Sequence, residues 1–162
     1  MNAGNDGTPA NPWALFASFH IQRTSRAMAL VMAAELEQFE LRPSEATILC
    51  MIDRNPGISQ ASISKMIATR RPNVSPIARD LQRRGLIERR RAGGKGSGLA
   101  VTAEGKILSE KINAIVGKNE ERMLDTLPPV ARDLFKDALE DCGRGFLDRL
   151  RELKPDASPA LE

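Results

Sequence analysis

The chain has 162 residues, of which 41% are hydrophobic and 28% are charged, and its formal net charge is +3. These values are typical of a single globular domain with short extensions and exclude a disordered chain. No stretch approaches 18 consecutive apolar residues, so no membrane-spanning helix is expected. The first residues lack a basic segment followed by an apolar one, so we expect no signal peptide.

The composition also argues against an enzyme. Cys50 and Cys142 each lie in an apolar periodic segment, so we expect no disulfide framework, and a cytoplasmic location fits. The chain has one histidine, His20, and no tyrosine, and its Cys, His and acidic residues show no metal-ligand spacing. Phosphate-binding loops and the motifs of serine and zinc hydrolases do not occur. We therefore expect no catalysis, no cofactor and no metal.

Positive charge is concentrated in the middle of the chain. Residues 65–95 contain ten Lys and Arg and two acids, so this segment carries +8 and the rest of the chain carries −5. Most of these cations are arginines beside turn signals and small polar residues. This pattern favours a nucleic-acid surface over an ordinary solvated face.

A long first helix is predicted at the N-terminal end. Asn11 is placed as its N-cap and Pro12 at its first position, and the helical pattern continues to about Phe39. Apolar residues recur along it at spacings of three and four, and His20 and Arg23 are set inside this otherwise apolar stripe.

Two shorter helices are predicted next. The second begins around Pro43 and ends at the break Asn55-Pro56-Gly57, and the third is short, with Ser59 as its N-cap.

The start of the fourth helix is ambiguous because two prolines lie within five residues. Pro72 is one candidate for the first helical position, in which case Pro76 distorts the first turn. The alternative places Ser75 as N-cap and Pro76 at the first position. Either way, Gly85 ends the helix.

A β-hairpin and two long helices complete the chain. Short strands are predicted at 86–89 and 99–101, joined by a glycine-rich basic loop. Thr102 is expected to cap the next helix, which has Gly105 in its first turn, and the last helix follows Pro128-Pro129.

The centre of the chain therefore reads as a helix-turn-helix followed by a β-wing. Residues 81–89 match a leucine, three residues, glycine, leucine, an aliphatic residue, any residue and arginine. Residues 101–106 match a leucine-threonine-x-x-glycine-basic pattern, with Val101 at the leucine position. Ile58-Ser59-Gln60 and Val74-Ser75 lie at the expected distances upstream. With these four motifs in register, residues 11–150 resemble the MarR family of bacterial winged-helix transcription regulators.

The resemblance implies a mainly α fold. It comprises a winged helix-turn-helix with a two-stranded β-wing, flanked by N- and C-terminal dimerisation helices. The expected organisation is a disordered tail at 1–10, a helical dimerisation region at 11–39 and 103–152, a DNA-binding lobe at 40–102 and a disordered tail at 153–162. A homodimer on a pseudo-palindromic double-stranded DNA operator follows from the family. Wide apolar faces on the terminal helices indicate a dimer independently.

The expected DNA-binding residues lie in the helix-turn-helix and the wing. They are Ser59, Gln60, Arg70, Arg71, Pro72, Asn73, Ser75, Arg79, Arg89, Arg90, Arg91 and Lys95. Two positions depart from the family pattern. The wing has Gly93, Gly94 and Lys95 where an aspartate and arginines are usual, and Pro76 replaces a commonly basic position.

Many family members bind a small, often aromatic or phenolic, acid between the dimerisation helices and the DNA-binding lobe. The candidate effector-binding residues here are Trp13, Phe16, Phe19, His20, Arg23 and Cys50. A cation beside an imidazole, against aromatic walls, suits a carboxylate. The alternative is structural, with Arg23 paired to an acid and His20 satisfied at an interface.

The predicted function is a DNA-binding transcription regulator, and repression is the family's commoner mode. An acidic aromatic effector or its thioester, from the catabolism of aromatic compounds, would release the operator. The alternative is a winged-helix interaction module that binds an acidic protein or RNA without a small-molecule effector.

Overall fold

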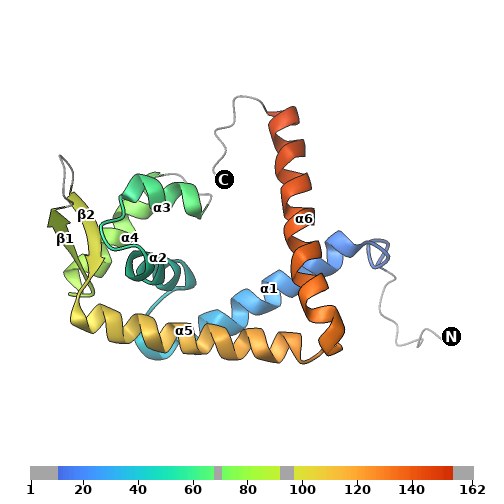
Figure 1. Ribbon diagram of the computed structural model, residues 1–162, viewed down its shortest axis with the longest axis horizontal. Helices are drawn as coiled ribbons and strands as arrows, with labels where there is room; N and C mark the ends of the chain where they lie inside the picture. Colours follow the sequence, from blue (N-terminus) through green and yellow to red (C-terminus); the bar gives the residue numbers. More distant parts are fainter. Residues whose placement is uncertain (1–10, 68–70, 92–96, 155–162) are drawn as a thin grey trace.

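The computed structural model describes residues 11–67, 71–91 and 97–154. Within this part, the predicted mainly helical class with a two-stranded antiparallel wing is confirmed, and Figure 1 shows the wing and the shorter helices gathered into one lobe. The elements are α1 (Ala17–Leu36), η1 (Glu37–Phe39), α2 (Pro43–Arg54), α3 (Gln60–Met66), α4 (Arg71–Arg83), β1 (Ile87–Arg91), β2 (Ser97–Val101), α5 (Ala103–Leu124) and α6 (Pro129–Leu153).

The first helix begins later than predicted. The side chain of Asn11 accepts a hydrogen bond from the Trp13 backbone at 2.9 Å, which is a cap, but the chain then makes short turns and becomes extended at Phe16. Helix α1 starts only at Ala17 and ends at Leu36, with η1 following. The prediction of a helix from Pro12 was wrong because the Asn-Pro signature caps a turn as well as it caps a helix.

The second and third helices agree with the sequence signals. Helix α2 has Pro43 in its first turn, and its backbone start is closed by Glu45, whose side chain accepts from the Arg42 N–H at 2.8 Å. Ser59 caps α3 as predicted, since its Oγ accepts from the Ser62 N–H at 3.0 Å.

The ambiguity over the fourth helix is resolved in favour of the early start. Helix α4 runs from Arg71 to Arg83 with Pro76 inside it. Pro76 has no N–H to donate to the carbonyl of Pro72, so one helical hydrogen bond is missing in the first turns. Gly85 follows the helix with φ +71°, a left-handed conformation that ends it.

The wing is longer than predicted and is extended by a third short segment. Strands β1 and β2 are antiparallel and pair from Ile87 with Val101 to Arg91 with Ser97. The chain after α2 adds to β2, because the Gly57 N–H donates to the Leu99 carbonyl at 2.8 Å and the Leu99 N–H donates to the Ile58 carbonyl at 2.9 Å. The hairpin is therefore fixed to the helix-turn-helix through the backbone.

One apolar core holds the lobe together and reaches into the long helices. Its fully buried members come from α2, α3, α4 and the hairpin, and Leu36 of α1 and Ile112 of α5 join them. Helix α2 supplies the centre through Ile48, Leu49 and Ile52, each completely buried. The orientation of the lobe on α1 and α5 is therefore set by packing on α2.

The start of α5 is fixed against the turn between α4 and β1. Thr102 caps α5 by accepting from the Gly105 N–H at 3.1 Å, and its hydroxyl donates to the Gly85 carbonyl at 2.6 Å. The Thr102 N–H donates to the Leu86 carbonyl at 3.1 Å. Gly105 lies so close that a Cβ at this position would be 1.9 Å from the Leu86 oxygen. Glycine is therefore required here by a close approach of two backbones.

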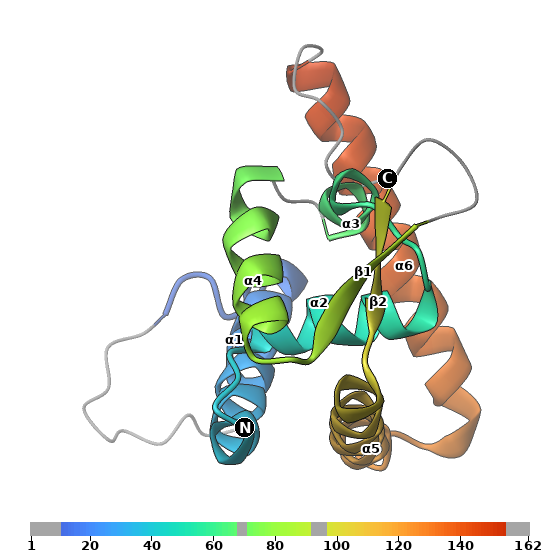
Figure 2. The same cartoon turned by 90° about the vertical axis from the view of Figure 1, so that its left-hand side faces the viewer.

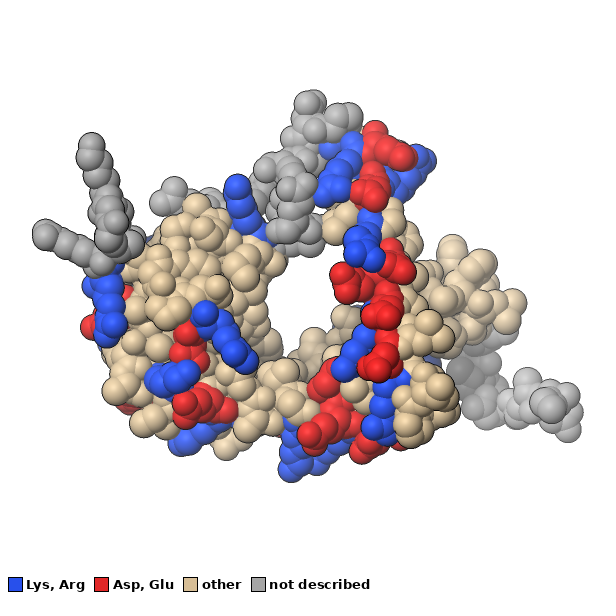
Figure 3. All heavy atoms as spheres, viewed as in Figure 1, with Lys and Arg blue, Asp and Glu red and all other residues tan. Residues whose placement is uncertain are grey.

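The long helices leave much apolar surface uncovered. None of the 25 residues of α6 is buried, and Leu36 is the one buried residue of α1. Val130, Leu134 and Phe146 of α6 are 89%, 70% and 71% exposed. Figure 3 shows acidic and basic side chains intermixed along the visible face of α6, where ion pairs such as Arg149 with Glu152 lie within the helix. A helix with such an apolar face is stable only when that face is covered.

No helix in the part of the chain that the structure describes is both long and apolar enough to cross a membrane.

Substitution of Gly105 tests the close approach at the start of α5. We expect Gly105→Ala to lower the free energy of unfolding by more than about 2 kcal/mol, because the new methyl group meets the backbone of Leu86. The measurement is urea unfolding followed by circular dichroism. Gly117→Ala is the matched control on the same helix, since nothing lies within 4 Å of its Cβ position. We expect it to stabilise by up to about 1 kcal/mol; equal effects of the two substitutions would contradict the argument.

Candidate nucleic-acid interface and ligand cavity

One face of the lobe contains α4, the β1–β2 hairpin and α3. Figure 2 looks onto this face, where α4 and the β1–β2 hairpin lie side by side and α3 lies next to them. Helix α3 contacts α4, and α4 contacts β1. The surface combines the exposed side of a helix with an antiparallel ribbon, which are the two elements that winged-helix proteins insert into the grooves of DNA.

The predicted DNA-binding residues occupy this face, with some outside the described residues. Arg71 and Pro72 begin α4 and Arg91 ends β1, whereas Arg70 and Lys95 lie outside the described residues. The remaining predicted residues are exposed or half-buried on α3, α4 and β1; they are Ser59, Gln60, Asn73, Ser75, Arg79, Arg89 and Arg90.

Two of these residues fix the angle between α3 and α4. The Ser75 hydroxyl donates to the Gln60 side-chain oxygen at 2.9 Å. Ser59 also has a structural contact, since its hydroxyl caps α3. The helix-turn-helix angle therefore depends on polar side chains as well as on the core.

The exposed arginines divide by their partners. Among the described residues, no acid pairs with Arg79 or Arg89, whereas Arg90 pairs with Glu88 at 2.7 Å. Arg83 hydrogen-bonds Asp80, and this contact holds the pKa of Asp80 below its usual value. Arg79 and Arg89 are thus two cations of this face whose charge no described acid neutralises.

Arg84 has a structural role. Its guanidinium donates to the Phe39 carbonyl at 2.9 Å and to the Glu40 carbonyl at 2.8 Å. Glu40 is in the left-handed region, with φ +53°, at the end of η1. Arg84 therefore ties the end of α4 to the junction between α1 and α2, and satisfies carbonyls that the end of η1 leaves free.

A large cavity lies between the lobe and the long helices. Its volume is about 1110 Å³ and its walls come from α1, α2, α5 and the end of α3. The walls are mainly apolar, with Arg23, Arg54 and Arg122 among the polar residues. Arg122 lies 3.8 Å from Glu35, but no described acid pairs with Arg23 or Arg54.

The cavity includes half of the predicted effector residues. His20, Arg23 and Cys50 line it, whereas Trp13, Phe16 and Phe19 do not. Among the described residues, no phenylalanine or tryptophan lines this cavity, so the expected aromatic walls are absent from it. The reason is the late start of α1, which leaves Trp13 and Phe16 ahead of the helix.

His20 and Arg23 differ in whether the described residues give them a polar partner. The His20 Nε2 lies 2.8 Å from the Ala14 carbonyl, to which it donates, so the imidazole secures the turn before α1. This contact agrees with the structural alternative for His20. Arg23 lacks the acidic partner among the described residues that the structural alternative required of it.

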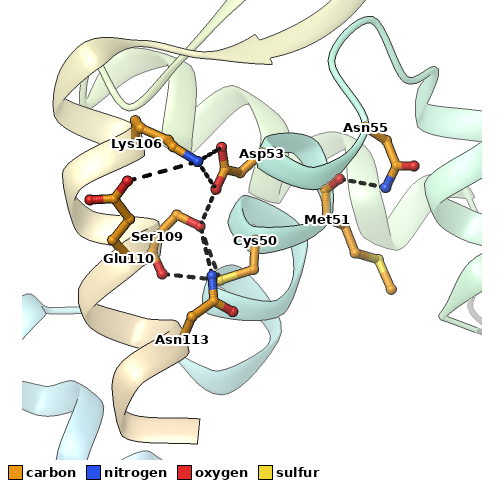
Figure 4. Close-up of polar contacts among 8 residues, drawn as sticks. All are labelled: Cys50, Met51, Asp53, Asn55, Lys106, Ser109, Glu110 and Asn113. Atoms are coloured by element: carbon orange, nitrogen blue, oxygen red, sulfur yellow. Dashed lines mark hydrogen bonds and ion pairs between the residues drawn. The ribbon is translucent and has the colours of Figure 1, made fainter. Parts of the chain in front are cut away.

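A buried polar network joins the cavity wall to α5. Figure 4 shows Asp53 of α2 between Lys106 and Ser109 of α5. The Asp53 carboxylate is 6% exposed and accepts from the Lys106 ammonium at 3.1 Å and from the Ser109 hydroxyl at 2.9 Å. Cys50, which lines the cavity, has its Sγ 3.5 Å from the Ser109 Oγ. Two charge-assisted contacts therefore hold α2 against α5 directly behind the cavity.

The protonation of Cys50 follows from this network. Burial raises the pKa of the Cys50 thiol, and the nearby Asp53 carboxylate raises it further, while the hydrogen bond with Ser109 acts in the opposite direction. A thiol with a raised pKa is a poor nucleophile at neutral pH. Cys50 is therefore a packing residue of the cavity wall.

Sequence reasoning missed the Asp53 network. Asp53 falls inside the second helix predicted from Pro43 to the break at Asn55, and its partners Lys106 and Ser109 lie more than 50 residues away. The available signal was an acid on the buried side of an amphipathic helix, which requires a partner.

Comparisons with known proteins identify the class of protein to which this fold corresponds. The family model described as MarR family matches residues 41–92. The HTH-type transcriptional repressor Rv2887 of Mycobacterium tuberculosis is 25% identical over 125 residues, which are 76% of this chain and 90% of that protein. The chain is thus a winged helix-turn-helix protein.

Solved structures agree with this class. The Staphylococcus aureus MepR–DNA complex superimposes with a TM-score of 0.75 at 23% identity, covering 85% of this chain and 99% of that one. The M. tuberculosis Rv2887 complex with p-aminosalicylic acid gives a TM-score of 0.64 at 23% identity and covers 78% and 98%. The resemblance to the MarR family stated from the sequence is confirmed by the family-model match over residues 41–92, and relatives named as transcriptional repressors match most of the chain.

The pKa of Cys50 is testable by alkylation. In a Cys142→Ser background, we expect the rate of reaction with iodoacetamide to rise with pH around a midpoint above the value of about 8.5 for a free cysteine. Asp53→Asn removes a negative charge that disfavours the thiolate, so it should move the midpoint down. The same protein in concentrated urea is the control and should show the free-cysteine value. A folded midpoint below that value would contradict the assignment.

Proposed function

We propose that the protein binds double-stranded DNA as a homodimer and represses transcription until a small acidic ligand releases it. The observation that carries the DNA-binding part is the common face of α4 and the hairpin, with Arg79 and Arg89 unpaired among the described residues. The MepR structure, which contains DNA, has the same fold and supports this proposal.

The proposed division of labour follows the sequence boundaries. Residues 40–102 form the DNA-binding lobe, and residues 11–39 and 103–152 form the dimerisation region. Support comes from the exposed apolar face of α6, which includes Leu134 and Phe146, because a second copy is the covering that a symmetric dimer provides. Asn73 and Arg79 on α4 are assigned to base edges, and the cations of the hairpin to phosphates.

The proposed effector site is the cavity between α1, α2 and α5. Arg23 provides the positive charge for a carboxylate, since no described acid neutralises it. Rv2887, which is similar in sequence and fold, has been solved with p-aminosalicylic acid. A ligand in this cavity releases DNA only when it binds better to a lobe spacing that does not fit the operator, and a tenfold loss of DNA affinity requires about 1.4 kcal/mol of such preference.

A salt titration tests the DNA-binding proposal. If a dimer neutralises about eight to ten phosphates, the slope of log K against log salt should lie near −7 to −9. The measurement is fluorescence anisotropy with a duplex selected by the protein from a random library. A slope shallower than about −3 would favour the interaction module, which binds RNA or an acidic protein instead.

Variants that each remove one positive charge test the DNA-binding residues in the same titration. Arg89→Ala should reduce the steepness of the slope by about 2, because the homodimer loses one phosphate contact in each subunit. Lys118→Ala, which removes an exposed charge from α5, is the control and should leave the slope unchanged.

Removal of the Arg23 charge tests the effector site. We expect Arg23→Gln to weaken the binding of an aromatic acid such as salicylate about tenfold or more, because a charged hydrogen bond contributes about 1.5–3 kcal/mol. Isothermal titration calorimetry measures the affinity. Arg26→Gln is the matched control, since Arg26 is an exposed arginine of the same helix that does not line the cavity. Equal losses in the two variants would place the acid elsewhere.

A further inference from the structure

The methionines of this chain are gathered at one site. The sequence contains six methionines, and all five that follow Met1 line the cavity between the lobe and the long helices. They come from every wall: Met28 and Met32 from α1, Met51 from α2, Met66 from α3 and Met123 from α5. Five thioethers on four helices, in a cavity that no described phenylalanine or tryptophan lines, give it an unusual chemistry.

The sulfur atoms are largely without polar partners. Met32 Sδ accepts from the Asn119 side-chain amide at 3.4 Å, and no described residue makes such a contact with the other four sulfurs. Met28 and Met66 are 45% and 52% exposed, so their side chains border open space. A thioether is polarisable and makes favourable contacts with the edges and faces of aromatic rings, and its three rotatable bonds let it follow the shape of a ligand.

The size of the cavity also limits which ligands fit it. At about 1110 Å³ it lies near the upper end of the range of roughly 300–1,000 Å³ that is typical of sites for drug-sized molecules. A single-ring acid leaves most of this space unfilled, and the sulfurs on the far walls then have no ring within reach. Arg23 and Arg54 lack acidic partners among the described residues, whereas Glu120, the one acid among the lining residues, pairs with Lys136 at 3.7 Å. The described wall therefore carries a net positive charge.

We infer that the ligand of this cavity is a planar acid with two or more fused aromatic rings, held between methionine sulfurs instead of between aromatic side chains. The inference rests on the proposed function, because it names the chemical class of the effector of that same site. The rings lie against the thioethers of α1, α2 and α5, and the carboxylate is directed to Arg23. A straight-chain acid of similar apolar area fills the space but gains no sulfur–ring contact.

The experiment uses the full chain labelled with ¹³C at the methionine methyl groups. Anthracene-2-carboxylate is the probe, benzoate is the control for size, and decanoate is the control for apolar area without a ring. We expect anthracene-2-carboxylate to bind at least tenfold more tightly than benzoate and to shift at least three cavity methionine signals through ring currents. If benzoate binds as tightly, or if no methionine signal shifts with the anthracene acid, the inference is overturned.

Substitution by leucine keeps the volume of the side chain and removes the sulfur. Each of Met28→Leu, Met51→Leu and Met123→Leu should weaken the binding of anthracene-2-carboxylate about two- to tenfold and change the binding of decanoate less than twofold. Equal losses for both acids would overturn the inference, because they would show that only packing was changed.

A DNA-release assay separates this inference from the proposed function. If the anthracene acid shifts the methionine signals but leaves DNA affinity unchanged, the ligand class stands and the release mechanism fails. If another acid releases DNA without shifting any methionine signal, the ligand class is overturned and the release mechanism stands.

Discussion

The structure depends on the contact between the start of α5 and the turn that follows α4. At this point the recognition helix ends at Gly85, β1 begins, β2 ends and Thr102 caps the long helix. The Thr102 hydroxyl and N–H both donate to carbonyls of that turn, and Gly105 lets the two backbones touch. Because these contacts join short segments, α4 and the wing take their position from α5.

Much of the lobe was predictable because local signals decide it. Ser59, Pro43 and Gly85 mark helix ends whatever surrounds them, and alternating residues define the hairpin. The sequence could not settle where α4 starts, since two proline signatures compete locally and the packing of Val74 and Ala78, both buried in the core, decides between them. The early start predicted for α1 failed for the same reason, because Asn11 and Pro12 satisfy a turn equally well.

Only those residues of the candidate site that lie on one helix could be predicted together from the sequence. His20 and Arg23 share a helix, so their joint approach to the cavity followed from spacing. The methionine lining comes from four helices and the Asp53 network from residues more than 50 positions apart, and neither has a local signature. Aromatic walls were expected because Trp13 and Phe16 continue the helical spacing of the apolar residues. The chain is extended at Phe16 and α1 begins only at Ala17, so this spacing does not place Trp13 and Phe16 on the same face as His20 and Arg23.

The Asp53 network lies between the wall of the cavity and α5, the helix that follows the wing. Asp53 is buried and draws α2 against α5 through Lys106 and Ser109, and Cys50, one turn before Asp53, is part of the cavity wall. A ligand that pushes α2 away from α5 lengthens contacts to a buried carboxylate, which is costly because water cannot replace the lost partners fully. The two contacts therefore favour the separation of α2 and α5 seen in this structure. Since α2 supplies the centre of the lobe core and α5 anchors the wing, a change in this separation alters the presentation of α4.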